Sequence, residues 1–280
     1  MEIPELWSST DRLAEAALMR AVGDEDLLGA LLAIDGAPAH EADAARAWLD
    51  DAAARVRQAV AESRARPGHA TDRAVAALVQ VLVDGEHLVG DASDYYAPDN
   101  SRLTRVIARR AGQPILVSSV WILVGARAGL DVVGIGLPGH FVVAVGERIV
   151  DPYQGGRVLT PEVCRELAAR AMPGRPFDPA WLAPATVGSI AGRVLRNLAN
   201  AQRQKGDGTS VYRTVRLLAT LAPDDGPVQI ELGRLAEDLG AWPEALGTYR
   251  HIAKAFAGRR EAQIAELKVM ELESRTRILN

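Results

Sequence analysis

Apolar residues recur three and four positions apart over most of the chain, which is the spacing of amphipathic helices. The first such stretch runs from Asp24 to about Glu62 and is interrupted at Pro38, so we predict a helix, a break and a second helix. A further amphipathic stretch covers about Thr71 to Leu88. The helical spacing returns near Pro161, and roughly the last hundred residues are predicted to be entirely helical.

The middle of the chain has a different pattern. The stretch PILVSSVWILVGARAG, which begins at Pro114, is apolar around its whole circumference until Arg127 and therefore predicts a central, buried helix. After Gly129 the apolar residues form three β-branched runs, DVVGIGL, HFVVAV and RIVDPY. These runs predict three strands, with Gly146 and Glu147 as the turn between the last two.

The segment DASDYYAPDNSRL, which precedes the central helix and a shorter one, is rich in turn-forming residues and predicts a loop. We expect Asn100 or Ser101 to cap the helix that follows, and Gly112 to end that helix in a left-handed conformation. Arg109 and Arg110 lie at its end, where structural salt bridges are the expected role of cations.

The turn at Gly146 and Glu147 sets the register of the predicted hairpin. It pairs Val142 with Asp151, which places His140 and Asp151 diagonally on one face, at a backbone separation of roughly 7 to 8 Å. A carboxylate bonded to one imidazole nitrogen leaves the other nitrogen free as a base, as in catalytic triads. The alternative is structural: Asp-Pro followed by Gly-Gly is good turn chemistry, and a histidine after Pro-Gly can bond the backbone at a strand entrance.

Composition narrows the classes of function. The 280 residues are 48% hydrophobic and 24% charged, as in an ordinary globular protein, and the net charge of −4 gives no general attraction to nucleic acid or to a membrane surface. The first residues lack the pattern of a signal peptide, so we expect a cytoplasmic protein. The single cysteine, Cys164, is expected in the core, and His140 has no second histidine at a metal-ligand spacing; we therefore predict no metal and no other cofactor.

Several spaced motifs between Tyr95 and Gly156 resemble the core of the transglutaminase-like SirB family. They are the tyrosine-rich loop with Asp99, Asn100 and Ser101, the Arg-x-Gly-x-Pro turn from Arg110 to Pro114, the Pro-Gly-His-Phe block and the Asp-Pro block. The likeness extends over roughly residues 25–275. It implies a papain-like arrangement in which a nucleophile near the start of the central helix faces a histidine and an aspartate on neighbouring strands; His140 and Asp151 match the last two.

The nucleophile departs from transglutaminase chemistry, which uses a cysteine thiolate. The first turn of the central helix, Pro114 to Val117, contains no thiol, and Cys164 follows Asp151 in the chain. Ser118 falls at the family's serine position and is the candidate nucleophile. The alternative for Ser118 is a buried serine that bonds the carbonyl one turn back. Ser118 and Ser119 point about 100° apart on a helix, so at most one of them faces the histidine.

Aromatic and polar residues of the same motifs are candidates for lining a cleft: Tyr95, Tyr96, Asp99, Asn100, Phe141 and Tyr153. For Asp99 and Asn100, hydrogen bonding within the loop is the other interpretation.

The segment PVQIELGRLAEDLGAWPEALGTYRHIAKAF resembles a tetratricopeptide repeat. Its small residues Gly233, Gly240 and Ala245 let two antiparallel helices pack closely beside Tyr249. A single repeat needs neighbours, which we expect to be helices at roughly 187–204 and 211–221.

These observations predict an α+β protein with a helical N-terminal segment (1–90), a transglutaminase-like core (91–172), a linker (173–187) and a tetratricopeptide-like helical domain (188–280). The leading hypothesis is a protein that has lost the cysteine chemistry and binds a peptide or protein partner, not nucleic acid or membrane. The alternative is a serine-dependent hydrolase or acyltransferase that uses Ser118, His140 and Asp151. A third possibility is that the histidine and aspartate serve stability alone. Oligomeric state stays open.

Overall fold

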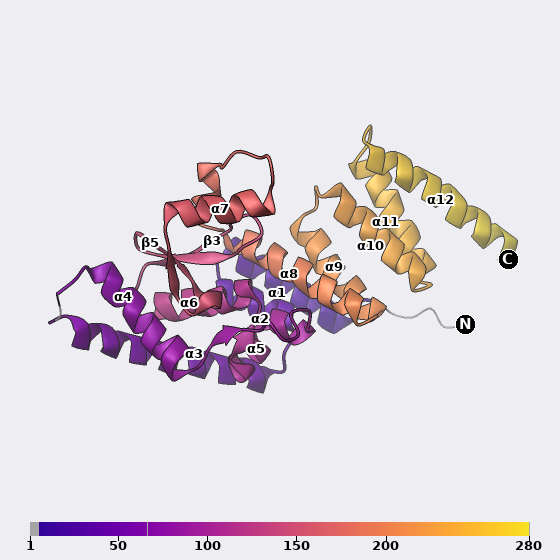
Figure 1. Cartoon of the computed structure of the whole chain (residues 1–280). Coiled ribbons are helices and arrows are strands. Elements are labelled where there is room, and N and C mark those ends of the chain that lie inside the picture. The colour runs from indigo at the N-terminus through magenta and orange to yellow at the C-terminus, as the bar shows by residue number, and fades with distance from the viewer. Residues whose placement is uncertain (1–5, 66, 280) are drawn as a thin grey trace. The chain divides into compact units, whose positions relative to one another are not determined.

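The computed structural model describes residues 6–65 and 67–279, with side chains described as far as Ser274. The chain divides into two compact units (Figure 1). One unit comprises Arg20–Val194, and the other combines the described residues up to Met19 with those from Leu195 onward. Helices α1 (Ser9–Gly23) and α8 (Val187–Gln204) each contribute to both. The chain is an α+β protein, as predicted, while the finer division into four segments stays a prediction.

The first helices confirm the predicted break. Helix α2 (Leu27–Asp35) ends at Gly36 in a left-handed conformation, and α3 (Ala39–Ser63) begins directly after Pro38. Helix α4 (Ala70–Leu78) continues into a π-helical segment, η1 (Val79–Gly85), so the amphipathic stretch predicted next is helical almost throughout.

The short helix α5 (Leu103–Arg109) corrects two predictions. Its N-cap residue is Arg102, and the free backbone N–H of Thr104 in its first turn donates 2.7 Å to the carboxylate of Asp35 on α2. A residue distant in sequence therefore does the capping expected of Asn100 or Ser101, both of which lie in the 3₁₀ segment η2 (Pro98–Ser101).

Arg110 rather than Gly112 takes the left-handed conformation that ends α5, with φ of 57°. Its guanidinium stacks 4.5 Å over Trp48 and pairs with Glu86 at 2.7 Å, and these contacts hold the strained backbone. Gly112 instead belongs to β2 (Ala111–Gly112), which pairs in parallel with β1 (Val89–Gly90). A Cβ at Gly112 would come within 2.6 Å of Val106, so the glycine is required by close packing.

The central helix and the hairpin follow the predicted pattern. Helix α6 (Pro114–Arg127) is buried along most of its length. The sheet contains β3 (Val132–Ile135), β4 (Val142–Val145), β5 (Arg148–Asp151) and β6 (Arg157–Leu159), all antiparallel and in that order. Val145 pairs with Arg148 across a turn at Gly146 and Glu147, as predicted. The fourth strand, β6, was not predicted.

The sheet is covered on both faces. On one face Val132 packs against Gly125 of α6, and α6 also contacts α3. Helix α7 (Pro161–Ala171) covers the opposite face, where Cys164 and Leu159 pack with Val142. Cys164 is fully buried, which confirms its place in the core.

The second unit continues with α9 (Gly208–Leu221), α10 (Gly226–Asp238), α11 (Trp242–Ala255) and α12 (Arg260–Leu279). The helices expected at 187–204 and 211–221 are both present. Gly233 on α10 lies so close to Tyr249 on α11 that a Cβ would come within 2.6 Å of the ring, which is the close packing expected from the small residues. No helix within the described residues is both long and apolar enough to cross a bilayer.

Candidate functional site

The two serines of the central helix are both fully buried. Ser119 donates to the carbonyl oxygen of Ile115 one turn back, at 2.7 Å. Ser118 donates instead to the backbone carbonyl oxygen of Phe141, at 3.2 Å, and so reaches the segment that carries His140. Its hydrogen-bond partner is backbone, and the hydrogen bonds of the described side chains include none between Ser118 and the imidazole.

His140 lies just before β4 and is partly exposed. Its backbone N–H donates to the carbonyl oxygen of Leu137 at 3.0 Å and closes a turn in which Gly139 has a φ of 71°. A backbone hydrogen bond of the histidine at the start of a strand is what the structural alternative for His140 predicted. The imidazole itself lies close enough to Asp151 for its charge to lower the pKa of that carboxyl.

Asp151 ends β5 and is only 8% exposed. Its carboxylate accepts from the backbone N–H of Gln154 at 3.2 Å and thereby caps the 3₁₀ segment η3 (Pro152–Gln154). Burial raises the pKa of Asp151, against the smaller lowering effects of the Gln154 and Tyr153 amides and of His140. Within residues 6–65 and 67–279 no hydrogen bond joins Asp151 to His140, so Ser118, His140 and Asp151 lie near one another without forming a hydrogen-bonded triad.

A buried polar network shapes the tyrosine-rich loop. Asn100, fully buried, donates from its side-chain amide to the carbonyl oxygen of Asp94 at 2.8 Å and accepts from Arg109 at 3.0 Å. Arg109 also forms an ion pair with Asp91 at 2.9 Å. Asn100 therefore bonds within the loop and offers no exposed atom to a ligand, whereas Asp99 is exposed. The ion pairs of Arg109 and Arg110 are the structural salt bridges that were expected.

Gln113 continues this network toward the surface. It accepts from the hydroxyl of Ser101 and donates to the carbonyl oxygen of Tyr95, both at 3.0 Å. Tyr95 and Tyr96 are 40% and 46% exposed, and their rings meet edge to face with centroids 5.2 Å apart. The buried amides thus hold two adjacent aromatic side chains at the surface.

Asp91 anchors the start of the same loop. Its carboxylate accepts from the hydroxyl and the backbone N–H of Ser93 and from the N–H of Asp94, and these bonds hold its pKa well below the usual range despite burial. The hydroxyl of Tyr153 donates to the backbone carbonyl of Asp91 at 3.2 Å. The Tyr153 ring lies against Gly90 so closely that no Cβ fits there, and burial raises the pKa of the phenol. Tyr153 is therefore a support of the loop.

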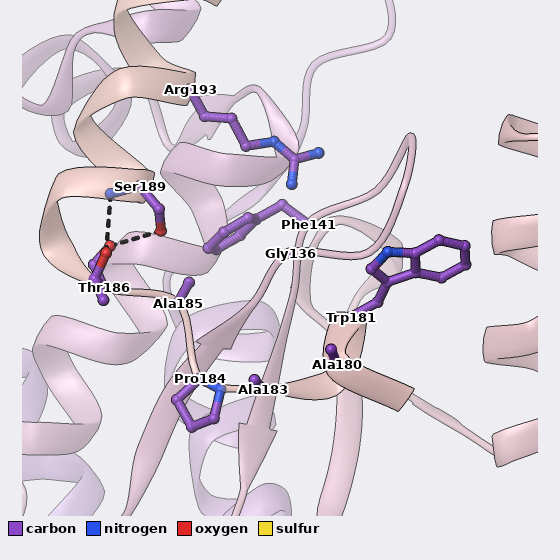
Figure 2. A pocket seen from close by; sticks show the side chains of 10 residues that line it. All are labelled: Gly136, Phe141, Ala180, Trp181, Ala183, Pro184, Ala185, Thr186, Ser189 and Arg193. Atoms are coloured by element: carbon purple, nitrogen blue, oxygen red, sulfur yellow. Dashed lines mark hydrogen bonds between the residues drawn. The ribbon is translucent and has the colours of Figure 1, made fainter. Parts of the chain in front are cut away.

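A pocket of about 360 Å³ lies beside Phe141 (Figure 2). Trp181, in the 3₁₀ segment η4 (Pro179–Leu182), forms part of its wall, and Arg193 extends toward it from α8. One terminal nitrogen of Arg193, Nη2, donates to the carbonyl oxygen of His140 at 3.0 Å and, more weakly, to that of Leu137 at 3.4 Å. The guanidinium carbon lies 5.5 Å from the centroid of the Phe141 ring.

Arg193 and Trp181 were not predicted from the sequence as residues of the site. In the sequence Arg193 is one of several arginines on an amphipathic helix, more than 50 residues after His140, and Trp181 lies in a proline-rich linker. No local pattern brings either residue to the histidine. In the described part of the chain, no group of three or more His, Cys, Asp or Glu residues is placed to hold a metal ion.

Comparison with known proteins identifies the class. The family model of the transglutaminase-like superfamily matches residues 43–196, which is more than half of the chain and includes the central helix, the sheet, Ser118, His140 and Asp151. The chain belongs to this superfamily.

Several relatives resemble the chain over part of its length. A UPF0162 protein of Xylella fastidiosa strain Temecula1 is 28% identical over 193 residues, which are 66% of this chain and 69% of the relative. A UPF0162 protein of strain 9a5c is 34% identical over 159 residues, or 51% of this chain and 57% of the relative. Human F-box only protein 21 is 26% identical over 184 residues, which are 60% of this chain and 28% of that protein. No solved structure matches the chain significantly.

Proposed function

We propose that this chain is a peptide- or protein-binding module, built on a transglutaminase-like core of the SirB type, in which the ancestral catalytic centre has become a binding surface. The observation that carries the proposal is the Ser118 hydrogen bond. A nucleophile must be presented to substrate beside a base, whereas Ser118 is fully buried and donates to the Phe141 carbonyl.

The other members of the centre support the same conclusion. The first turn of α6, where a helix N-terminus favours a thiolate, contains Pro114, Ile115, Leu116 and Val117. The Asp151 carboxylate already accepts a hydrogen bond from the backbone N–H of Gln154, as a helix cap. No observation favours the serine-dependent hydrolase over this reading of the geometry.

The binding surface is the exposed part of the same centre. Tyr95 and Tyr96 present large apolar rings with polar tips, the kind of side chain that is enriched where proteins recognise partners. The bonds from Gln113 and Asn100 fix the loop before a partner arrives, which lowers the entropy lost on binding. His140 adds a partly exposed donor and acceptor at the edge of this surface.

The helices α10 and α11 supply a second surface in this proposal. Their close packing at Gly233 and Tyr249 is typical of a tetratricopeptide-like pair, and such arrays bind extended segments of other proteins. The repeat assignment is part of the proposal.

A peptide-display selection against the full chain tests the function. Enriched peptides should bind with at least about tenfold lower affinity to Tyr96→Ala and to His140→Ala, since each change removes a side chain of the proposed surface. Leu13→Ala, which removes a 73% exposed apolar side chain of α1 that belongs to neither proposed surface, is the control and should leave binding unchanged. The melting temperature of each variant should stay close to that of the wild type.

Two outcomes would contradict the proposal. One is that the selection yields no peptide whose binding depends on Tyr95, Tyr96 or His140. The other is that His140→Ala lowers the melting temperature and leaves binding intact, which is the behaviour of a residue that serves stability alone.

A further inference from the structure

Arg193 differs from several arginines of its unit that form ion pairs. Arg109, Arg110 and Arg127 each lie within 3.0 Å of a carboxylate, on Asp91, Glu86 and Asp50 respectively. For Arg193 no carboxylate within the described residues lies at ion-pair distance. Its Nη2 atom bonds two neutral carbonyl oxygens, which orient the guanidinium but leave its charge uncompensated.

Partial burial of a cation without an anion is unfavourable, because its charge loses part of its hydration and gains no opposite charge in return. Burial accordingly lowers the pKa of Arg193. The Nε and Nη1 hydrogens have no acceptor among the described hydrogen bonds, so they are available to a ligand. An anion placed beside them would supply the missing partner through charge-assisted hydrogen bonds.

Most of the other residues that line the pocket are apolar. We name it the Arg193 pocket and define it by Phe141, Trp181, Ala183, Pro184, Thr186 and Arg193 (Figure 2). Its hydroxyl groups are engaged locally, since Thr186 accepts from the backbone N–H of Ser189 and the Ser189 hydroxyl donates to the Thr186 carbonyl. The ligand must therefore combine one anionic group with an adjacent apolar group.

We propose that the Arg193 pocket binds the C-terminal carboxylate of a peptide whose last side chain is apolar. This inference rests on the proposed function and names the ligand end that the surface recognises. In a terminal residue the carboxylate and the side chain leave the same Cα atom, so one can meet Arg193 while the other lies between Phe141 and Trp181. A volume of about 360 Å³ is at the small end of ligand sites, which suits one side chain with its carboxylate.

Other anions match the pocket less well. An internal Asp or Glu side chain carries no apolar group next to its carboxylate. A phosphate group brings more charge and more acceptors than one arginine can satisfy. The Tyr95 phenol lies near enough to Arg193 for its ionised form to raise the pKa of the guanidinium. A peptide is favoured over a free small acid because the residues before its last one can extend toward this exposed tyrosine pair.

Twenty fluorescein-labelled octapeptides test the proposal. They share seven glycine and serine residues, differ only in the last residue, and are made both as free acids and as C-terminal amides. Fluorescence polarisation with the full chain should show that free acids ending in Phe, Leu or Ile bind at least about tenfold more tightly than their amides, as expected for one charge-assisted hydrogen bond. Equal affinity of acids and amides would overturn the proposal.

Two matched pairs of variants test whether the free acids bind in the Arg193 pocket. Arg193→Gln should abolish the preference for the free acid, while Arg175→Gln, an exposed arginine of the same unit, should keep it. Because Arg193 also holds two backbone carbonyls, a second test leaves it in place. Ala183→Glu puts a negative charge at the exposed pocket wall and should bind the free acids at least about tenfold more weakly than Ala183→Gln, which has the same size without the charge. Retention of acid binding in Ala183→Glu, with the protein folded, would contradict the assignment.

The outcomes separate this inference from the proposed function. If N-acetylphenylalanine binds as tightly as the best octapeptide, the pocket takes small acids and the peptide assignment is wrong. If display-selected peptides depend on Tyr96 and His140 but bind Arg193→Gln normally, the proposed function stands and the Arg193 inference fails. If no peptide from either set binds, both fail.

Discussion

The hydroxyl of Ser118 donates a hydrogen bond to the backbone carbonyl oxygen of Phe141 over 3.2 Å. Both residues are buried, at 0% and 3% exposure, so the bond joins the second turn of α6 to the residue after His140 without contact with solvent. The serine satisfies a carbonyl that lies outside any helix, and its hydroxyl is therefore committed to the packing of helix against sheet.

Replacing Ser118 by alanine should lower the free energy of unfolding by about 1–2 kcal/mol, since the Phe141 carbonyl loses its donor in a buried place. Ser119→Ala is the control and should have a smaller effect, because the Ile115 carbonyl that it bonds lies within α6. Urea denaturation measures both. A larger loss for Ser119→Ala would mean that the Ser118 bond contributes little.

A serine-directed fluorophosphonate should leave the native protein unlabelled at position 118. The reagent needs an accessible hydroxyl beside a base, and Ser118 is buried and bonded to backbone. Mass spectrometry after labelling is the measurement. A stoichiometric adduct that disappears in Ser118→Ala would establish the hydrolase alternative instead.

The stability contribution of Asp151 should fall as pH rises. Burial raises the pKa of Asp151 above its ordinary 3.8, so the folded state holds this proton more tightly than the unfolded chain does. Stability from this group is full below about 3.8 and is lost as pH rises from there through the raised folded value.

Asp151→Asn removes this titration and keeps an oxygen that accepts from the Gln154 amide. Relative to the wild type, the variant should gain free energy of unfolding between pH 4 and pH 7. Asp84→Asn, at an exposed position, controls for the change in net charge. A difference between Asp151→Asn and the wild type that is independent of pH would contradict the expectation.

The stability contribution of Asp91 should change with pH in the opposite direction. Hydrogen bonds from Ser93 lead the groups that hold its pKa below 3.8, so its stabilisation is present above that pH and is lost as pH falls below it. Asp91→Asn should cost about 2 kcal/mol at pH 7, because an amide NH₂ group replaces the buried carboxylate oxygen that pairs with Arg109.

The same variant should weaken peptide binding, since the loop that presents Tyr95 and Tyr96 starts at Asp91. Asp99→Asn, an exposed carboxylate of that loop, should change neither property. Urea denaturation across pH and the display-selected peptides supply the two measurements. Unchanged stability of Asp91→Asn at pH 7 would show that the carboxylate does not anchor the loop.

Replacing each of two glycines of the second unit by alanine should change the stability in opposite directions. Gly233→Ala places a methyl group 2.6 Å from the Tyr249 ring and should destabilise the unit by about 1–3 kcal/mol. Gly247→Ala, where the Cβ meets nothing within 4 Å, should stabilise helix α11 by up to about 1 kcal/mol. Thermal denaturation of the full chain compares them. Equal effects would mean that α10 and α11 are not tightly packed at Gly233.

Much of the fold was predictable because its causes are local. Helical spacing around Pro38, the all-apolar run of α6 and the β-branched runs around Gly146 each depend on neighbours along the chain. The turn at Gly146 is also a local feature, and it places Val145 opposite Arg148. This register brings His140 near Asp151. Strand β6 was not predicted, because it follows a turn, is only three residues long and has no alternating pattern of its own.

What the sequence by itself determined is the inventory of elements, the register of the hairpin and the absence of a thiol from the first turn of α6. Only the tertiary structure decided how the polar groups are partnered. It brought Asp35 to the first turn of α5 and paired the Ser118 hydroxyl with a backbone carbonyl. It also placed Arg193 at the His140 segment, where no carboxylate of the described residues pairs with it. Hydrogen bonds and charges act between residues that are close in space, whatever their separation along the chain, and no periodicity in the sequence records those distances.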